Sequence, residues 1–152
     1  MKKLLFLLVT MMVLLIGCSN GSDLQEYEHS SLKDDLKGEP FQAKLPTKLP
    51  FEVELATFTP APTEEQKESI QTFQFDGING ELLDMKAFKN EVDYGEIDKE
   101  EVTIGGETGY YFENENDAKI LIWINEGMNY ELATMEKSIT KNDLVEVAKS
   151  IK

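Results

Sequence analysis

The sequence predicts an α+β domain: an antiparallel sheet of about six or seven strands in meander order, able to curve, with a C-terminal helix packed on one face. Three observations lead to this fold class. Short segments alternate apolar and polar residues, glycine-containing turn dipeptides separate them, and one amphipathic stripe closes the chain. The length of 152 residues leaves room for one such domain.

Proline, alternation and turn signals organise the first half of the domain. Residues 45–50 contain two prolines and are expected to be extended. Residues 51–55 alternate apolar and acidic side chains, which is typical of a half-buried strand. Residues 70–75 and 81–88 flank two turn dipeptides, Asp76-Gly77 and Asn79-Gly80, and are predicted to pair as a hairpin.

A second hairpin is predicted from residues 102–104 and 108–112. The pair Gly105-Gly106 lies between them, and two glycines supply the positive φ angles that a tight primed turn requires. The connection makes these two strands antiparallel neighbours.

The third predicted hairpin contains the only tryptophan, Trp123. Its strands, 119–124 and 128–135, flank the turn residues 125–127. A three-residue loop would point Trp123 away from the C-terminal helix, whereas a two-residue turn would pair it with Tyr130 and reverse its direction. We favour the three-residue loop and expect a partly exposed Trp123, unless another segment such as residues 45–50 closes that side.

The end of the chain carries the clearest helix signal. Thr140 precedes Asp143 by three residues, as in a capping box. The apolar residues that follow share one face of a helix: Leu144, Val147, Ala148 and Ile151. One helix is therefore expected to cover one face of the sheet.

Charge excludes several classes of partner. The chain has 29 acidic and 15 basic side chains, a net charge of −14, and every basic residue is a lysine. Such a domain would repel nucleic acid and anionic headgroups. Without arginine it also lacks the planar fork suited to phosphate esters.

The N-terminus has the features of an exported precursor. Lys2 and Lys3 precede an apolar run that ends at Leu15-Ile16-Gly17-Cys18. The pattern resembles the lipobox of bacterial lipoprotein precursors. The resemblance implies cleavage between Gly17 and Cys18 and a diacylglycerol thioether on Cys18, with acyl chains such as palmitate, as the only attached group. It places the protein at the outer face of the cytoplasmic membrane, anchored by lipid.

We therefore expect a signal peptide at 1–17, a lipidated tether at 18–40 and a single extracytoplasmic domain at 41–152. The tether segment is polar, with a short helix expected after Ser30-Ser31. The only histidine, His29, lies in this segment and is expected to be solvated.

No catalytic constellation stands out, and we expect no enzyme and no cofactor. Nucleophilic catalysis needs a base beside the nucleophile, and zinc sites need imidazole or thiolate ligands. Residues 113–117 alternate oxygen-bearing side chains, but Ala118 stands where a calcium loop requires glycine. We interpret this segment as a solvated turn.

Four segments suggest a family: Leu45 to Phe51, Val102-x-Ile-x-Gly106 with Gly109-Tyr110, Leu121-x-Trp123 to Tyr130-x-Leu132, and Ala148 to Ile151. Together they resemble a domain of unknown function that occurs in lipoproteins and extracytoplasmic regulatory proteins of low-GC Gram-positive bacteria. The similarity covers residues 41–152. It supports the fold and the location and provides no catalytic residues.

These observations favour a non-enzymatic binding module at the cell surface. Its expected partners are the membrane, through the anchor, and an unidentified protein, peptide or envelope component, with no nucleic acid. The predicted binding residues are Trp123, Leu121 and Tyr111, and no metal is expected. The alternative is a lipophile-binding or carrier-like domain with a groove on the open face of the sheet.

Replacement of Cys18 by alanine should abolish incorporation of labelled fatty acid and block processing, because the thiol is the acceptor for the lipid. Metabolic labelling and immunoblotting of membrane and medium fractions measure both effects. A fully processed Cys18→Ala protein that stays on the membrane would contradict the anchor.

Overall fold

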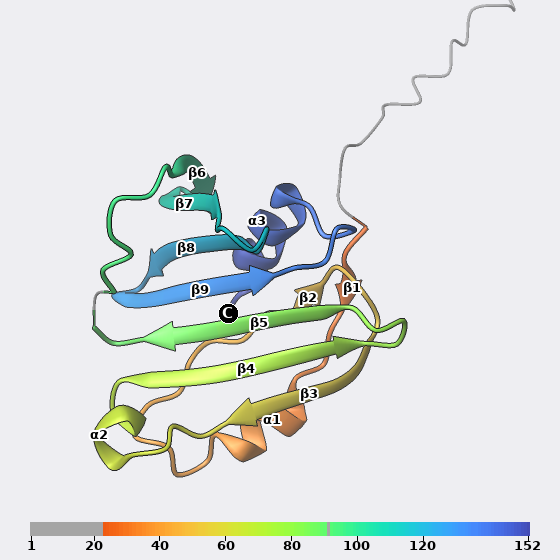
Figure 1. Cartoon of the computed structure of the whole chain (residues 1–152). Coiled ribbons are helices and arrows are strands. Elements are labelled where there is room, and N and C mark those ends of the chain that lie inside the picture. The colour runs from red at the N-terminus through yellow and green to blue at the C-terminus, as the bar shows by residue number, and fades with distance from the viewer. Residues whose placement is uncertain (1–22, 91) are drawn as a thin grey trace, which may run out of the picture.

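The computed structural model describes residues 23–90 and 92–152 of the chain, so the predicted signal peptide, Gly17 and Cys18 lie outside the described residues. Its elements in chain order are β1 (Gln25–Glu26), α1 (Ser30–Asp35), β2 (Lys48–Leu49), β3 (Val53–Thr59), α2 (Glu64–Lys67), β4 (Ile70–Gly77), β5 (Leu82–Phe88), β6 (Glu100–Ile104), β7 (Glu107–Glu113), β8 (Lys119–Asn125), β9 (Met128–Thr134) and α3 (Lys141–Ser150) (Figure 1).

Seven of the strands form one antiparallel sheet in the order β3-β4-β5-β9-β8-β7-β6. It consists of two meanders, β3 to β5 and β6 to β9, which meet where β5 pairs with β9. A separate two-stranded ladder joins β1 to β2. The predicted α+β class, with an antiparallel sheet and a C-terminal helix on one face, is confirmed.

The three predicted hairpins all form. β4 pairs with β5, β6 with β7, and β8 with β9. The turn between β6 and β7 has φ of 60° at Gly105 and 103° at Gly106, the two positive angles that the glycine pair predicts.

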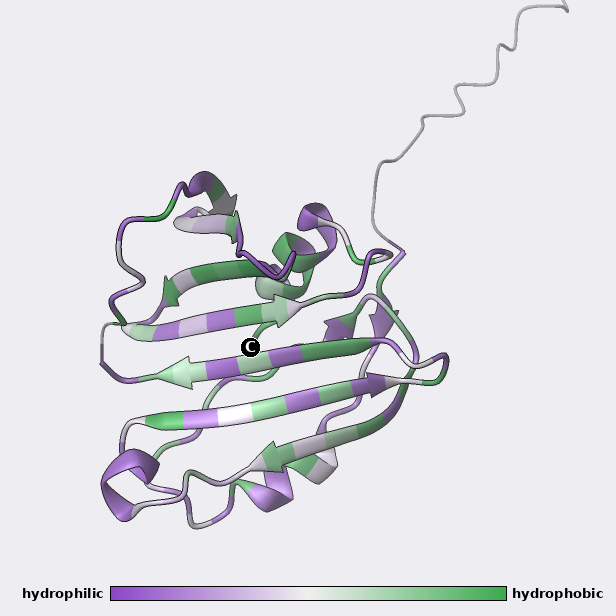
Figure 2. Ribbon diagram, viewed as in Figure 1, coloured by the Kyte–Doolittle hydropathy of each residue, from purple (hydrophilic) through white to green (hydrophobic). Residues whose placement is uncertain are grey.

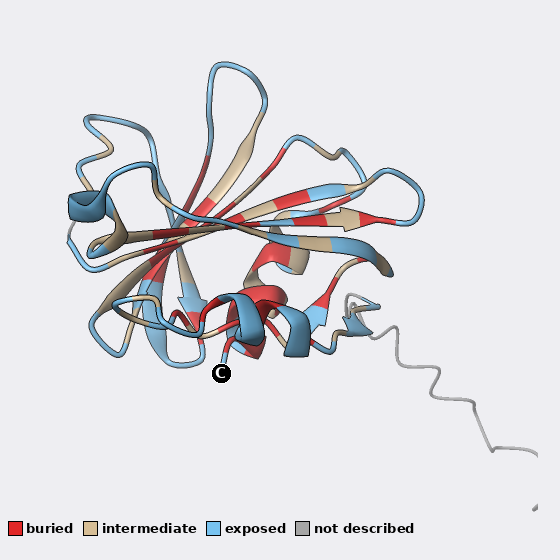
Figure 3. Cartoon of the chain, turned by 90° about the horizontal axis from the view of Figure 1, so that it is seen from below, coloured by how far each residue is buried: buried red, intermediate tan, exposed pale blue. Residues whose placement is uncertain are grey.

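The sheet has one covered face and one open face. Figure 3 shows α1, α3 and the short strands β1 and β2 on one side of the sheet. We call this side, beneath α1, α3 and residues 37–51, the covered face, and the opposite side the open face. The covered face contributes Phe73, Phe75, Leu83, Met85, Leu121, Trp123, Tyr130 and Leu132 to the core, and the layer packed on it contributes Leu32, Leu36, Leu45, Leu49, Ile139, Leu144, Val147 and Ile151.

The turn between β8 and β9 differs from the favoured prediction. Glu126 and Gly127 both have positive φ, 50° and 80°, and Asn125 pairs with Met128, so the connection is a two-residue turn. Trp123 consequently pairs with Tyr130 and points to the covered face. The predicted three-residue loop and the exposed Trp123 are both wrong, because one residue of register exchanges the two faces of a strand.

The composition of β8 explains the ambiguity. Figure 2 shows this strand coloured as hydrophobic along most of its length. Ile120, Ile122 and Ile124 alternate with Leu121 and Trp123, so either face could have been buried. The structure buries the face with the bulkier indole ring.

A glycine on β7 makes room for the indole. Gly109 is the register partner of Trp123. A Cβ atom at Gly109 would lie 2.6 Å from Cδ1 of Ile104 and 3.2 Å from Cβ of Trp123. Any larger residue would therefore force the side chains around Trp123 apart.

The C-terminal helix forms as predicted. The Thr140 side chain accepts a hydrogen bond from the Asp143 backbone N–H, and the Asp143 carboxylate accepts one from the Thr140 backbone N–H, which completes the capping box. The predicted apolar stripe, Leu144, Val147, Ala148 and Ile151, is buried against the covered face.

The segment predicted as a tether is largely part of the fold. The predicted short helix forms as α1, but its Leu32, together with Leu36, is fully buried in the core. The Tyr27 ring meets the Phe75 ring edge-on at 5.6 Å. The tether prediction is therefore wrong for residues 24–40, whose scattered apolar residues find partners far away in the sequence.

The proline-containing segment ties the two ends of the domain together. Pro46 forms a bridge with Ile151, and the Thr47 N–H donates to the Ser150 carbonyl over 3.3 Å. The Tyr27 N–H donates to the Thr47 carbonyl over 2.8 Å.

Among the described residues no helix is both long and apolar enough to cross a membrane.

Replacement of Leu32 by alanine should lower the free energy of unfolding by about 2–5 kcal/mol, because it opens a cavity in a packed core. Urea unfolding followed by circular dichroism measures the change. The control is Leu55→Ala at a residue that is 56% exposed, where the change should stay below about 0.5 kcal/mol. If the Leu32→Ala protein were as stable as the parent, residues 24–40 would not be part of the core, and the tether prediction would hold for them.

Candidate functional site

The three predicted binding residues belong to the core. Trp123 is 4% exposed, and Leu121 and Tyr111 are also buried. All three lie on the covered face beneath the helical layer. The three do not form one exposed surface, because the register of β8 with β9 turns them to the covered face. Of the three, only Trp123 contributes to the lining of the pocket described below.

Trp123 has a structural role in this layer. Its ring stacks on the Tyr130 ring at a centroid separation of 5.3 Å and an interplanar angle of 17°. The Tyr130 hydroxyl accepts a hydrogen bond of 3.0 Å from the Lys44 backbone N–H. The pair therefore joins the sheet to the segment that precedes β2.

Apolar side chains that the core does not use remain on the open face. Ile124 of β8 is 54% exposed and Tyr110 of β7 is 40% exposed. Tyr110 pairs with Ile122 across β7 and β8, and Ile124 pairs with Asn129 across β8 and β9. These rows form an apolar floor on the side that α3 leaves uncovered.

The connection between β5 and β6 crosses this floor. We call its described part, residues 92–99, the strap. The Tyr94 ring contacts the Phe112 ring at a centroid distance of 5.9 Å, and the Tyr94 hydroxyl donates to Oε2 of Glu131 over 2.8 Å. Since Phe112 and Glu131 both lie on the open face, the strap lies on that face too.

A polar cluster holds the strap in place. Glu131 is 8% exposed, and its Oε1 accepts a 2.8 Å hydrogen bond from Nζ of Lys86 on β5. Burial first, and then the hydrogen bond to Glu131, raise the pKa of the Tyr94 hydroxyl above its ordinary value. Tyr94 thus remains protonated and keeps donating to the carboxylate at physiological pH.

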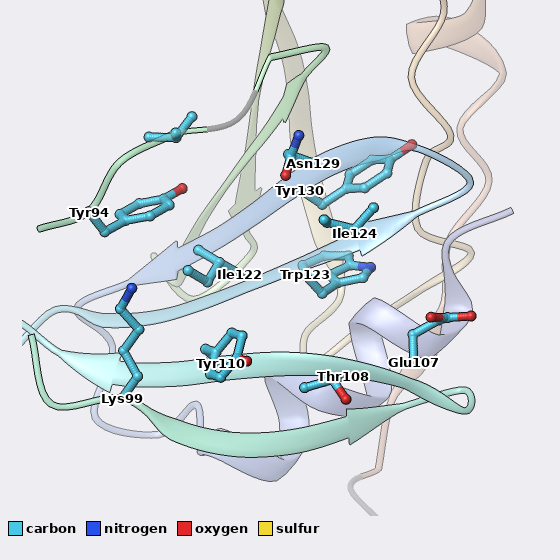
Figure 4. Close-up of a pocket in the computed structure, with 11 residues that line it drawn as sticks. Tyr94, Lys99, Glu107, Thr108, Tyr110, Ile122, Trp123, Ile124, Asn129 and Tyr130 are labelled. Carbon is cyan, nitrogen blue, oxygen red and sulfur yellow. The ribbon is translucent and has the colours of Figure 1, made fainter.

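The floor and the strap enclose a pocket of about 450 Å³, within the size range of ligand sites (Figure 4). Figure 4 shows Tyr94, Tyr110 and Ile122 turned toward one space, with Lys99 beside them. Its lining consists of Val92, Tyr94, Lys99, Glu107, Thr108, Tyr110, Ile122, Trp123, Ile124, Asn129 and Tyr130. The pocket thus has an apolar floor and a polar rim.

His29 lies far from this pocket. It precedes α1, which packs near β3, at the opposite edge of the sheet from β6. The ring is buried, its Nδ1 has no hydrogen-bond partner, and burial lowers its pKa. The prediction of a solvated histidine is wrong.

The acidic segment after β7 is an exposed turn. Oδ1 of Asn114 accepts hydrogen bonds from the backbone N–H groups of Asn116 and Ala118, at 2.9 and 3.0 Å. Within residues 23–90 and 92–152, no three His, Cys, Asp or Glu side chains gather in a way that could hold a metal ion.

Part of the chain is similar to a known family. Residues 89–151 match the family described as a domain of unknown function (DUF4367). The DUF4367 match contains the strap, β6 to β9 and α3, and therefore every residue that lines the pocket. No curated protein matches the chain, and no solved structure matches it.

The sequence contained a signal for this site that the prediction did not use. When a strand is apolar on both faces and only one helix is available to cover the sheet, one apolar face of the strand remains exposed. Ile122 and Ile124 could have been identified in this way. Tyr94 could not, because nothing local shows that its hydroxyl meets Glu131.

The structure reverses the exposure expected of Trp123. Emission from the only tryptophan should be blue-shifted and poorly quenched by acrylamide, because the indole is buried and stacked. Stern–Volmer titration of the folded protein, with the urea-unfolded protein as control, measures the shielding. Quenching equal to that of the unfolded chain would contradict the register of β8 and β9.

Proposed function

We propose that the protein is a non-enzymatic binding module, held at the outer face of the cytoplasmic membrane by lipid on Cys18, that binds its ligand in the open-face pocket. The observation that carries the proposal is the exposure of Ile124 and Tyr110 on the floor of a pocket. Exposed apolar residues grouped in a concave site are typical of ligand binding.

Chain length and geometry bear on how the module is held. Only the six residues 19–24 separate Cys18 from β1, a span of at most about 20 Å when extended. The described chain starts near the end of the sheet where β9 ends, and the pocket lies at the end where β8 turns into β9 (Figure 1). An anchor at Cys18 thus leaves the pocket at the end of the sheet farther from the attachment point.

The positions of the only cysteine and the only histidine of the chain support a binding role. Cys18 is the lipid acceptor in this proposal. His29 is buried at the far edge of the sheet from the pocket. The pocket itself offers tyrosine, threonine, asparagine, lysine and glutamate side chains, which suit recognition by contact and hydrogen bonding.

The second candidate is a lipophile-binding domain. The apolar floor of Ile122 and Ile124 favours it. Against it, the row of Tyr110 and Ile122 continues into Glu131 and Lys86, whose ion pair ends the apolar surface at the next two strands. An acyl chain would therefore meet a charged pair within the sheet.

A neutral aromatic fragment such as 4-ethylphenol should bind residues 23–152 in the pocket, with amide shifts confined to the strap, β7 and β8. Two-dimensional NMR titration measures the shifts. Ile124→Glu should abolish them, because a carboxylate on the floor must be desolvated when the fragment binds.

The matched control is Leu55→Glu. Leu55 is 56% exposed and belongs to β3, and the open face of β3 is four strands from β8. This variant should bind the fragment like the parent. Fragment shifts that survive in Ile124→Glu, or that spread evenly over the protein, would contradict a binding role for the pocket.

A further inference from the structure

We propose that the occupant of the open-face pocket is a segment of another protein in which an aliphatic or aromatic side chain stands beside lysine or arginine. This inference rests on the proposed function and names its ligand. It follows from the shape of the floor, the charges around it and the position of the pocket.

The floor accommodates a short apolar group. Ile122, Ile124 and Tyr110 supply its apolar surface, and Tyr94 of the strap faces it from above. The buried Glu131, held by Lys86 and Tyr94, closes the floor toward β5. One or two side chains of a peptide fit this surface, whereas a long acyl chain has no apolar path beyond it.

The rim supplies polar groups for a peptide backbone. Asn129 and Thr108 both line the pocket, and their amide and hydroxyl groups each donate and accept hydrogen bonds. A peptide carries one N–H and one carbonyl per residue, all of which need partners when buried. Nδ2 of Asn129 already donates to the Asn90 carbonyl over 3.3 Å. The Asn129 amide oxygen and the Thr108 hydroxyl are the groups that a peptide can pair with and an acyl chain cannot.

Carboxylates dominate the surroundings of the pocket. Between Val92 and Ile104 the chain has five acidic residues and one lysine, Lys99. Glu100 is paired with Lys141 at 2.6 Å, which leaves four carboxylates to one lysine in this segment. Glu107 lines the pocket, and Glu101 is the register partner of Tyr110. With a net charge of −14 over the whole chain, this field attracts a basic ligand and repels an anionic amphiphile.

Two tyrosines add a specific attraction for cations. The Tyr94 ring already has Nζ of Lys99 at 5.9 Å from its centroid, within the range of a cation–π contact. Tyr110, 40% exposed, offers a second ring at the same pocket. Because Lys99 already lies over the Tyr94 ring, a basic side chain of the partner would lie against the Tyr110 ring while its neighbour fills the apolar floor.

The test uses the full chain in nanodiscs of zwitterionic phosphatidylcholine, with empty nanodiscs as the blank. Three fluorescein-labelled hexapeptides are titrated by anisotropy at low salt. The first is Lys-Leu-Lys-Tyr-Lys-Gly, the second has Glu in place of each Lys, and the third has Ser in place of Leu and Tyr. The first should bind at least about tenfold more tightly than either of the others.

Variants separate the two parts of the site. Ile124→Ser should weaken binding of the first peptide about tenfold, and Leu55→Ser should leave it unchanged. The double variant Glu101→Gln/Glu107→Gln should weaken it about fivefold and flatten its salt dependence. A circular-dichroism spectrum and a urea midpoint equal to those of the parent protein verify that each variant is folded.

Equal binding of the charge-reversed peptide, or of the polar peptide, would overturn the proposal. So would displacement of the first peptide by palmitate below its micelle concentration, which would assign the pocket to an acyl chain. Either result, with the neutral fragment still bound in an Ile124-dependent way, would leave the binding role intact and reject only this ligand. Loss of fragment binding would reject the binding role itself.

Discussion

The stack of Trp123 on Tyr130 decides which side of the sheet becomes the core. The pair is formed by the register of β8 with β9 and tolerated by Gly109 on β7. Because strands alternate their side chains, burial of Trp123 sends Ile122 and Ile124 to the other side. The helical layer and the pocket are thus two results of one pairing.

The open face is also shaped by a charge that the fold buries. Glu131 lies beneath the strap with a lysine and a tyrosine hydroxyl as its partners. A buried carboxylate needs such partners, since removing it from water is costly. Through Tyr94, the same carboxylate positions a wall of the pocket, so Glu131 joins the strap to the sheet and limits the apolar floor.

Local signals in the sequence were sufficient for much of the fold. Gly105 and Gly106 specify their turn through their own backbone, and Thr140 with Asp143 specifies the start of α3, because each device involves only neighbouring residues. Leu32 and Leu36 carried no such signal, since their partners lie in a layer assembled from distant segments. The register of β8 was undecided for a related reason: both of its faces are apolar, and only the packing of the whole domain chooses between them. The candidate site depended on that choice, and its residues were therefore assigned to the wrong face.

The strand order has a consequence for how the domain is made. β9 occupies the middle of the sheet, although all six other strands of the sheet precede it in the chain. Without β9, the backbone N–H and carbonyl groups along one edge of β5 have no partner strand. Such an edge readily pairs with other chains. Between β5 and β9 the sequence contains the strap and the three strands β6 to β8, so this pairing is non-local. Non-local pairing slows folding. The two meanders can therefore be joined into one sheet only after β9, the last of its strands, is available at the centre.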